Sequence, residues 1–372
     1  MVNPILTEPG DYTALPLEKV YYGVGSLARL PEEVDRLGGG RALIVTGHSL
    51  ATLTELIHAV EGLLGARHAA TFAGIRQHAP ESGIAEAAQL ARDCQADVLV
   101  SVGGGSPIDA AKAVALRLAQ GGVYPPQIAI PTTLSAAEFS GSAGYTDEAQ
   151  KSKRGISDRM ITPRAIILDP QMTLPTPMWL WLSSGIRALD HAIETLYSPG
   201  YHPVNDVLAL ASLRDLFTYL PRCKAEPESM GNRQMCQQAA WMGYFSPASA
   251  AAAAGLSHTI GKRIGAPYDV PHGVTSCILL PHVMRYKAEN EADATRLAAM
   301  ARALGLADER VTAKEAALRA AEAVACLVRD LDLPARLRDV KVPEEDFERI
   351  AIASVGDTPQ AADVVQLLKS AW

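Results

Sequence analysis

The chain has 372 residues, of which 48% are hydrophobic and 20% are charged, and its formal net charge is −7. This length is enough for two domains of about 100–200 residues each, and the composition is that of a globular protein with a substantial core. The acidic balance argues against a dedicated nucleic-acid binder, which needs a basic face for the phosphates, and favours a small ligand.

Cysteine usage and the absence of long apolar runs favour a cytoplasmic protein. The five cysteines are odd in number and show no CxxC spacing, so we expect reduced thiols. No charged-then-apolar leader opens the sequence, and no apolar run reaches about 18 residues. Secretion and membrane spanning are therefore not expected.

The first half of the sequence alternates predicted strands and helices. Strands are predicted at 42–45, 70–72, 98–102, 127–130 and 165–170, with helices near 53–60 and over 84–94. Residues 134–165 are predicted to form a hairpin or an irregular insert. This alternation is typical of a Rossmann-like α/β domain with a parallel sheet, which we place at residues 1–175.

Residues 96–112 predict a phosphate-binding turn. Their apolar run is typical of a buried parallel strand and stops at the three glycines of residues 103–105. Ser106 is a good N-cap and Pro107 suits the first helical position, so we expect the free N–H groups of the next helix to face the glycines. A helix N-terminus carries roughly half a positive charge and commonly binds a pyrophosphate. A glycine-rich turn that binds nothing is the alternative.

Two further turns are expected at the same edge of the sheet. Thr132 and Thr133 follow a predicted strand, so their hydroxyls emerge at the carboxyl edge, where open α/β sheets bind ligands. Another strand ends in Thr46 and Gly47 where a carboxylate commonly holds the NAD ribose and repels the extra phosphate of NADP. We predict cofactor contacts at Thr46 and Gly47 and weak selectivity against NADP.

From Trp179 onward the sequence shows helical periodicity, little strand signal and many alanines. We expect about seven to nine helices in an all-helical domain over residues 176–372. Arg187 and His191 lie four residues apart on one predicted helix and share a face, whereas Asp190 is turned about 100° away from His191.

A second predicted helix carries His258 and Lys262, again four residues apart, and His272 follows a turn bracketed by prolines. A single histidine is most often a structural residue. Three histidines and two cations on paired helix faces instead indicate a functional site.

These motifs resemble the iron-containing, group III alcohol dehydrogenases. The resemblance rests on SVGGGSPIDAAK, PTT, HAIE and an H-x13-H spacing, and it covers nearly the whole chain. It implies a dehydroquinate synthase-like architecture, in which a hydride passes between NAD(P) and a carbonyl or alcohol carbon in a cleft between an α/β and a helical domain. It also implies a homodimer formed through the α/β domain.

Carried over position by position, the resemblance assigns three sets of residues. The pyrophosphate would be held by Gly103, Gly104, Gly105, Ser106 and Asp109. The rest of the cofactor would be lined by Thr132 and Thr133. The family's three histidine metal ligands correspond to His191, His258 and His272.

Two positions depart from the metal-dependent members of that family. Those members have an aspartate four residues before the first histidine, where this chain has Arg187, and many have a histidine at the position of Lys262. A guanidinium removes a metal ligand and adds a permanent positive charge. We therefore expect no metal and a small anionic dicarboxylate as substrate. This pattern resembles the maleylacetate reductase branch, which reduces maleylacetate to 3-oxoadipate in the breakdown of aromatic compounds.

The resulting hypothesis assigns catalysis to Arg187, Lys262 and the three histidines. The two cations pair with substrate carboxylates, a hydride from NADH or NADPH adds to a double bond conjugated with a ketone, and the histidines, which titrate near neutral pH, stabilise and protonate the enolate. The spacing leaves the proton donor open. Two alternatives are a metal-dependent alcohol dehydrogenase with a three-histidine site and a non-catalytic nucleotide-binding scaffold.

Overall fold

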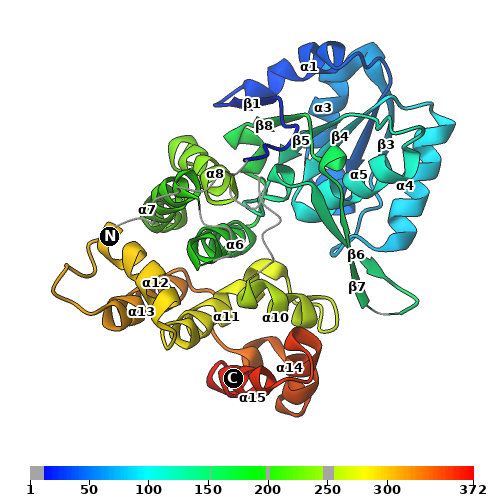
Figure 1. Ribbon diagram of the computed structural model, residues 1–372. Coiled ribbons are helices and arrows are strands. Elements are labelled where there is room, and N and C mark those ends of the chain that lie inside the picture. Colours follow the sequence, from blue (N-terminus) through cyan, green and yellow to red (C-terminus); the bar gives the residue numbers. More distant parts are fainter. Residues whose placement is uncertain (1–11, 151, 198–201, 246–254) are drawn as a thin grey trace. The chain divides into compact units, whose positions relative to one another are not determined.

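The computed structural model describes residues 12–150, 152–197, 202–245 and 255–372 (Figure 1). They form two compact units. The α/β unit contains Ala14–Pro177 and Pro227–Gln237, and the helical unit contains residues 12–13, Met178–Glu226 and Gln238–Trp372. The division into domains at residues 1–175 and 176–372 remains a prediction.

A short segment from the second half of the chain belongs to the α/β unit. Arg233 has 2% of its surface exposed and donates from Nη1 to the Thr173 carbonyl oxygen at 2.9 Å. Gln234 Oε1 accepts the Gly23 N–H at 2.7 Å. These bonds explain why the segment packs with the first half of the chain.

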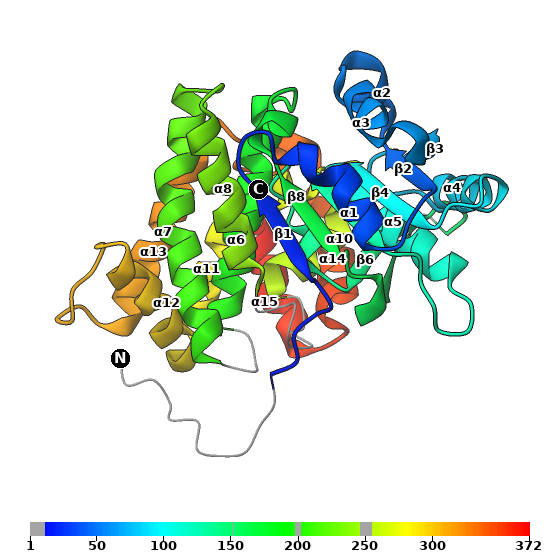
Figure 2. The same cartoon turned by 90° about the horizontal axis from the view of Figure 1, so that it is seen from above.

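A sheet of six parallel strands is the centre of the α/β unit, in the order β1-β8-β5-β4-β2-β3, and β1 lies beside β8 at its edge (Figure 2). The strands are β1 Lys19–Tyr22, β2 Ala42–Thr46, β3 His68–Phe72, β4 Val98–Gly103, β5 Gln127–Pro131 and β8 Ala165–Leu168. The antiparallel pair β6 Ser142–Asp147 and β7 Ser152–Ser157 forms a hairpin within the predicted insert. The predicted Rossmann-like parallel sheet is confirmed.

Helices cover both faces of this sheet. They are α1 Leu30–Arg36, α2 His48–Leu53, α3 Leu56–Leu64, α4 Glu81–Asp93 and α5 Gly105–Leu118. Ile44 packs in the apolar cluster with α1 and α3, whereas Leu43 packs in the cluster with α4 and α5. Successive strand residues point to opposite faces, so a sheet covered on both sides needs continuous apolar runs such as that of β2. The single helix expected near 53–60 is two helices, because Thr54 is extended.

The turn from β4 into α5 is built from glycines. Gly103 has φ 141°, a conformation that side chains rarely allow, and Gly104 is the N-cap with no side-chain cap bond. The predicted capping by Ser106 is wrong, because α5 already begins at Gly105 and Ser106 Oγ accepts the His78 N–H at 3.1 Å. The N-terminus of α5 therefore has no capping side chain, which suits an anion.

Asp109 of α5 connects this helix to the hairpin. Its Oδ2 accepts the Gly144 N–H of β6 at 3.0 Å, and its Oδ1 lies 3.6 Å from Nζ of the fully buried Lys112. Lys112 also donates to the Ser142 carbonyl at 2.8 Å and to Ser140 Oγ at 2.9 Å. Asp109 thus has a structural role beside the one that the family resemblance implies.

The second half of the described chain is helical. Its α-helices are α6 Met178–Tyr197, α7 Pro203–Ala225, α8 Met230–Gly243, α10 Leu256–Gly265, α11 His272–Lys287, α12 Glu291–Ala303, α13 Ala313–Asp330, α14 Phe347–Val355 and α15 Pro359–Ser370. One apolar core joins α10, α11, α14 and α15. No described helix combines the length and the hydropathy that crossing a membrane requires. All five cysteines are free thiols.

Candidate active site

Helix α6 carries three buried titratable side chains and, beside them, an arginine that is largely buried. Asp190 has no exposed surface, Glu194 has 5% and His191 has 8%, and the Arg187 side chain is 12% exposed. Charged side chains are rarely buried unless they are paired. Their partners come from α6 itself, α10 and α11.

Asp190 joins the three helices. Its Oδ2 accepts hydrogen bonds from Ser257 Oγ at 2.8 Å and from Ser276 Oγ at 2.6 Å, and it lies 3.5 Å from His258 Nδ1. Burial raises the pKa of Asp190. Helical spacing separated Asp190 from His191, but both residues contact His258. The sequence therefore missed a site residue.

Glu194 is the second residue that sequence reasoning missed. Its Oε2 accepts the Gly255 N–H at 2.8 Å, and its Oε1 accepts the N–H groups of Ser257 at 2.9 Å and His258 at 3.3 Å. Oε2 also lies 2.6 Å from His258 Nδ1. Glu194 thus occupies the N-terminus of α10, whose N-cap, Gly255, has no side chain, and burial raises its pKa to about 7.

The backbone at Gly255 leaves the space that Glu194 fills. A Cβ atom at Gly255 would lie 2.2 Å from Glu194 Cδ, which no side chain tolerates. The signal in the sequence was the HAIE motif, where a glutamate stands in an otherwise apolar stretch of helix. A charged residue on a buried helix face needs a partner, but the sequence does not show that the partner is the start of α10.

Two of the three predicted histidines are in contact. The His191 and His258 rings lie 4.7 Å apart between centroids, and His191 also packs edge-on against Tyr244 at 4.4 Å. His272 is the first residue of α11 and is half-buried against Gly265, where a Cβ would lie 2.9 Å from its Cε1.

The expectation that these histidines titrate near neutral pH is wrong for His191 and His258. Burial lowers the pKa of His258 to about 3, and the charge of Arg187 acts in the same direction. Burial also lowers the pKa of His191, and the charges of Arg187 and Lys262 add to the effect. Both imidazoles are therefore neutral at pH 7.

The two predicted cationic side chains differ in burial: Arg187 is largely buried, and Lys262 is exposed. Arg187 Nη1 donates to Ser276 Oγ at 3.1 Å and lies 3.7 Å from Asp190 Oδ2, so its charge faces the buried carboxylate. Lys262 is exposed on α10. Both charges lower the pKa values of the same two histidines, so both act on one site.

The site does not fit the three-histidine metal centre of the family. Among the described residues, the one group of three potential ligands whose atoms all lie within 4.8 Å of one another is Asp190, Glu194 and His258. Both carboxylates in that group already accept hydrogen bonds from α10, and the guanidinium of Arg187 adds a fixed positive charge beside Asp190. We assign no step to a metal ion.

The predicted cofactor residues of the α/β unit lie together around the glycine turn. The Thr132 N–H donates to the Gly103 carbonyl at 2.9 Å, and a Cβ on Gly104 would lie 3.1 Å from Thr133 Cγ2. A Cβ on Gly105 would also approach a neighbouring side chain, at 3.2 Å. The packing of the turn thus requires glycines, and the uncapped N-terminus of α5 is the feature that suits a pyrophosphate.

The two residues of the second predicted cofactor turn, Thr46 and Gly47, have different surroundings. Thr46 is fully buried, and its hydroxyl donates to the Val102 carbonyl at 2.9 Å, which joins β2 to β4. Gly47 is half-buried and is the N-cap of α2. The side chain of Thr46 thus serves the sheet, and cofactor contact at this turn remains a prediction.

Replacement of Glu194 tests its structural role in the site. Glu194→Ala leaves three backbone N–H groups of α10 without their acceptor, so we expect the free energy of unfolding to fall by about 2–4 kcal/mol. Glu194→Gln keeps acceptor oxygen and is expected to lose less. Urea unfolding followed by circular dichroism measures both. Glu315→Ala, an exposed glutamate in the first turn of α13, is the control and should change stability by no more than about 0.5 kcal/mol. Equal stability of Glu194→Ala and this control would exclude the role.

Comparison with known proteins identifies the family. The model of the iron-containing alcohol dehydrogenases matches residues 17–170, and that of the Fe-containing alcohol dehydrogenase C-terminal region matches residues 181–372. A maleylacetate reductase of Pseudomonas aeruginosa is 32% identical over 360 residues, 95% of each chain. Lactaldehyde reductase of Escherichia coli K12 is 32% identical over 382 residues, 95% of this chain and 98% of the relative. The crystal structure of maleylacetate reductase from Agrobacterium tumefaciens has a TM-score of 0.83 at 27% identity and covers 98% of both chains. The chain therefore belongs to the iron-containing alcohol dehydrogenase family and is an NAD(P)-dependent oxidoreductase.

Proposed function

We propose that this chain is a metal-independent maleylacetate reductase that forms 3-oxoadipate at the expense of NADH or NADPH. The observation that carries the proposal is the buried guanidinium of Arg187, 3.7 Å from Asp190 and bonded to Ser276, at the position where the metal-dependent members have an aspartate. The similarity to several curated maleylacetate reductases supports the same substrate.

The charges of the site favour an anionic substrate. Arg187 and Lys262 are both close enough to lower the pKa values of His191 and His258. A positive potential at neutral imidazoles attracts carboxylates and stabilises negative charge that develops during reaction. Maleylacetate carries two carboxylates, and its reduction passes through an enolate.

The proposed reaction balances as maleylacetate, NAD(P)H and a proton giving 3-oxoadipate and NAD(P)+. When bound, NAD(P)H supplies the hydride for the double bond conjugated with the ketone. Electrons move onto the ketone oxygen, where the charges of Arg187 and Lys262 stabilise the enolate, and a proton then adds to carbon.

The geometry supports His258 as the group that hydrogen-bonds to the reacting substrate. Glu194 contacts Nδ1 of the His258 ring at 2.6 Å and thereby fixes the orientation of the imidazole. Both ring nitrogens are buried, and neither meets the criteria of a hydrogen bond, but only Nδ1 has a carboxylate beside it, so Nε2 is the nitrogen that we assign to the substrate. A neutral imidazole in this orientation donates a hydrogen bond through Nε2–H when Nδ1 accepts from a protonated Glu194.

A second candidate is the reduction of a small uncharged aldehyde. The similarity to lactaldehyde reductase, as extensive as that to the maleylacetate reductases, favours it. The two candidates differ in charge, since an uncharged aldehyde has no group that would pair with Lys262. Activity on maleylacetate and on lactaldehyde, measured side by side, separates them.

The first prediction of this proposal concerns Arg187. Arg187→Ala removes the fixed positive charge, so we expect kcat with maleylacetate to fall about 100-fold, equivalent to about 2.7 kcal/mol in the activation free energy. Oxidation of NAD(P)H measures the rate, and circular dichroism confirms that the variant is folded. Unchanged turnover would remove Arg187 from the mechanism.

The second prediction concerns Lys262 and has a matched control in the next residue. Lys262→Met removes an exposed charge at the site, so kcat/KM for maleylacetate should fall about 10-fold or more, mainly through KM. Arg263→Met removes an exposed charge from the same helix and should have little effect. If both variants lose the same amount of activity, general charge rather than Lys262 attracts the substrate.

The third prediction concerns metal. Extensive dialysis against a chelator should leave maleylacetate reduction unchanged, and elemental analysis of active protein should find no stoichiometric iron or zinc. Added divalent ions should not raise the rate. Activity that disappears with the metal and returns with it would favour the metal-dependent alternative.

A further inference from the structure

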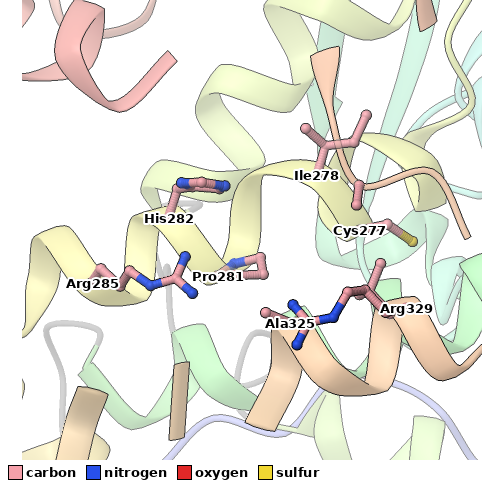
Figure 3. Close-up of a pocket in the computed structure, with 9 residues that line it drawn as sticks. Cys277, Ile278, Pro281, His282, Arg285, Ala325 and Arg329 are labelled. Atoms are coloured by element: carbon pink, nitrogen blue, oxygen red, sulfur yellow. The ribbon is translucent and has the colours of Figure 1, made fainter. Parts of the chain in front are cut away.

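A cavity lies in the helical unit between α11 and α13, away from the candidate active site. It has a volume of about 210 Å³, and its lining comes from α11, α13 and the loop that follows α13 (Figure 3). The lining residues are Cys277, Ile278, Pro281, His282, Arg285, Ala325, Val328, Arg329 and Ala335. We call it the α11–α13 pocket.

The floor of the α11–α13 pocket is apolar. Ile278 and Val328 are buried, Ala325 is small, and burial raises the pKa of the Cys277 thiol, which is therefore neutral. An apolar cavity of about 150 Å³ is large enough to bind benzene. The α11–α13 pocket therefore has room for one aromatic ring and a small polar substituent.

Two guanidinium groups lie at the polar side of the pocket. Arg285 Nη2 donates to Glu322 Oε2 at 2.9 Å, and Arg329 Nη2 donates to Glu322 Oε1 at 3.0 Å. One carboxylate thus holds both arginines, whose guanidinium groups point into the space between the two helices in Figure 3. Each guanidinium has five N–H donors, so this arrangement orders both groups and leaves other donors for a ligand.

The formal charges at the rim of the pocket favour an anion, although the side chains of Arg285, Arg329 and Glu322 are 38%, 56% and 54% exposed. Glu322 neutralises one of the two guanidinium charges, which leaves a net charge of about +1. His282 adds no charge at neutral pH, because burial lowers its pKa to about 4, and its Nδ1 lies 2.8 Å from Ser370 Oγ. A dicarboxylate would bring one negative charge more than the pocket compensates.

We propose that the α11–α13 pocket binds a small aromatic monocarboxylate, with the ring on the apolar floor and the carboxylate on Arg285 and Arg329. Paired guanidinium groups suit a carboxylate because they offer parallel N–H donors. The site is separate from the one around Arg187, although the chain connects them directly. Cys277 lines the pocket, and the preceding residue, Ser276, donates to Asp190.

Isothermal titration calorimetry with benzoate tests this proposal. A ligand of this size is expected to bind the full-length protein with a Kd of about 1 mM. Acetate has the charge without the ring and benzyl alcohol has the ring without the charge, so both should bind at least about 10-fold more weakly. Absence of saturable benzoate binding at about 10 mM, or equal binding of acetate, would overturn the proposal.

Variants locate the binding site. Arg329→Met should weaken benzoate binding about 10-fold or more, and Ala325→Leu, which fills the cavity, should abolish it. Arg319→Met is the matched control. Arg319 is an exposed arginine of α13 that pairs with Glu315, and it does not line the pocket. Arg319→Met should bind benzoate as the parent does.

Benzoate is itself an anion, so binding at Lys262 must be distinguished from binding at the pocket. Lys262→Met should retain benzoate binding. Loss of binding in Lys262→Met together with full binding in Ala325→Leu and Arg329→Met would place benzoate at the candidate active site and would refute the α11–α13 pocket as its site.

Discussion

The candidate active site depends on the partners that replace water around two buried carboxylates of α6, Asp190 and Glu194. An ionised carboxylate is expensive to move out of water unless partners replace its hydration. Glu194 gains three backbone N–H groups at the start of α10, and Asp190 gains two serine hydroxyls and the nearby guanidinium of Arg187. The same bonds connect α6 to α10 and α11. The positions of His258 and of Ser276 are thus consequences of how the carboxylates are satisfied.

Much of the α/β unit could be predicted from the sequence, because its signals are local. Unbroken apolar runs such as that of β2 identify a sheet covered on both faces, and the glycines after β4 identify a tight turn into α5. The errors there were local too. Ser106 has the right chemistry for an N-cap, but α5 begins before it, and its hydroxyl accepts the N–H of His78, a residue distant in sequence.

The helical site was predicted only in part, because its decisive contacts join distant residues. Helical spacing placed Arg187 and His191 on one face, and it also turned Asp190 away from His191. Spacing along one helix cannot show that α10 packs against α6 and brings His258 to both His191 and Asp190. The pKa values of the histidines could not be predicted from the sequence for the same reason. A histidine in isolation titrates near neutral pH, but burial beside fixed cations keeps His258 neutral, and burial is a property of the packed helices.

In the proposed function, Arg187 stands where the family resemblance implies an aspartate, and this difference bears on which substrates the site would favour. A divalent ion would polarise any carbonyl oxygen that it binds, whether or not the substrate is charged. The guanidinium of Arg187 lies beside Asp190, so the carboxylate compensates part of its positive charge. Lys262, exposed on α10, leaves its charge closer to solvent, where it acts on a substrate over a longer range. Such an arrangement stabilises a substrate with its own carboxylates more than an uncharged aldehyde, which gains little from Lys262. The proposed selectivity for anions and the proposed independence from metal would thus have the same origin, the guanidinium of Arg187.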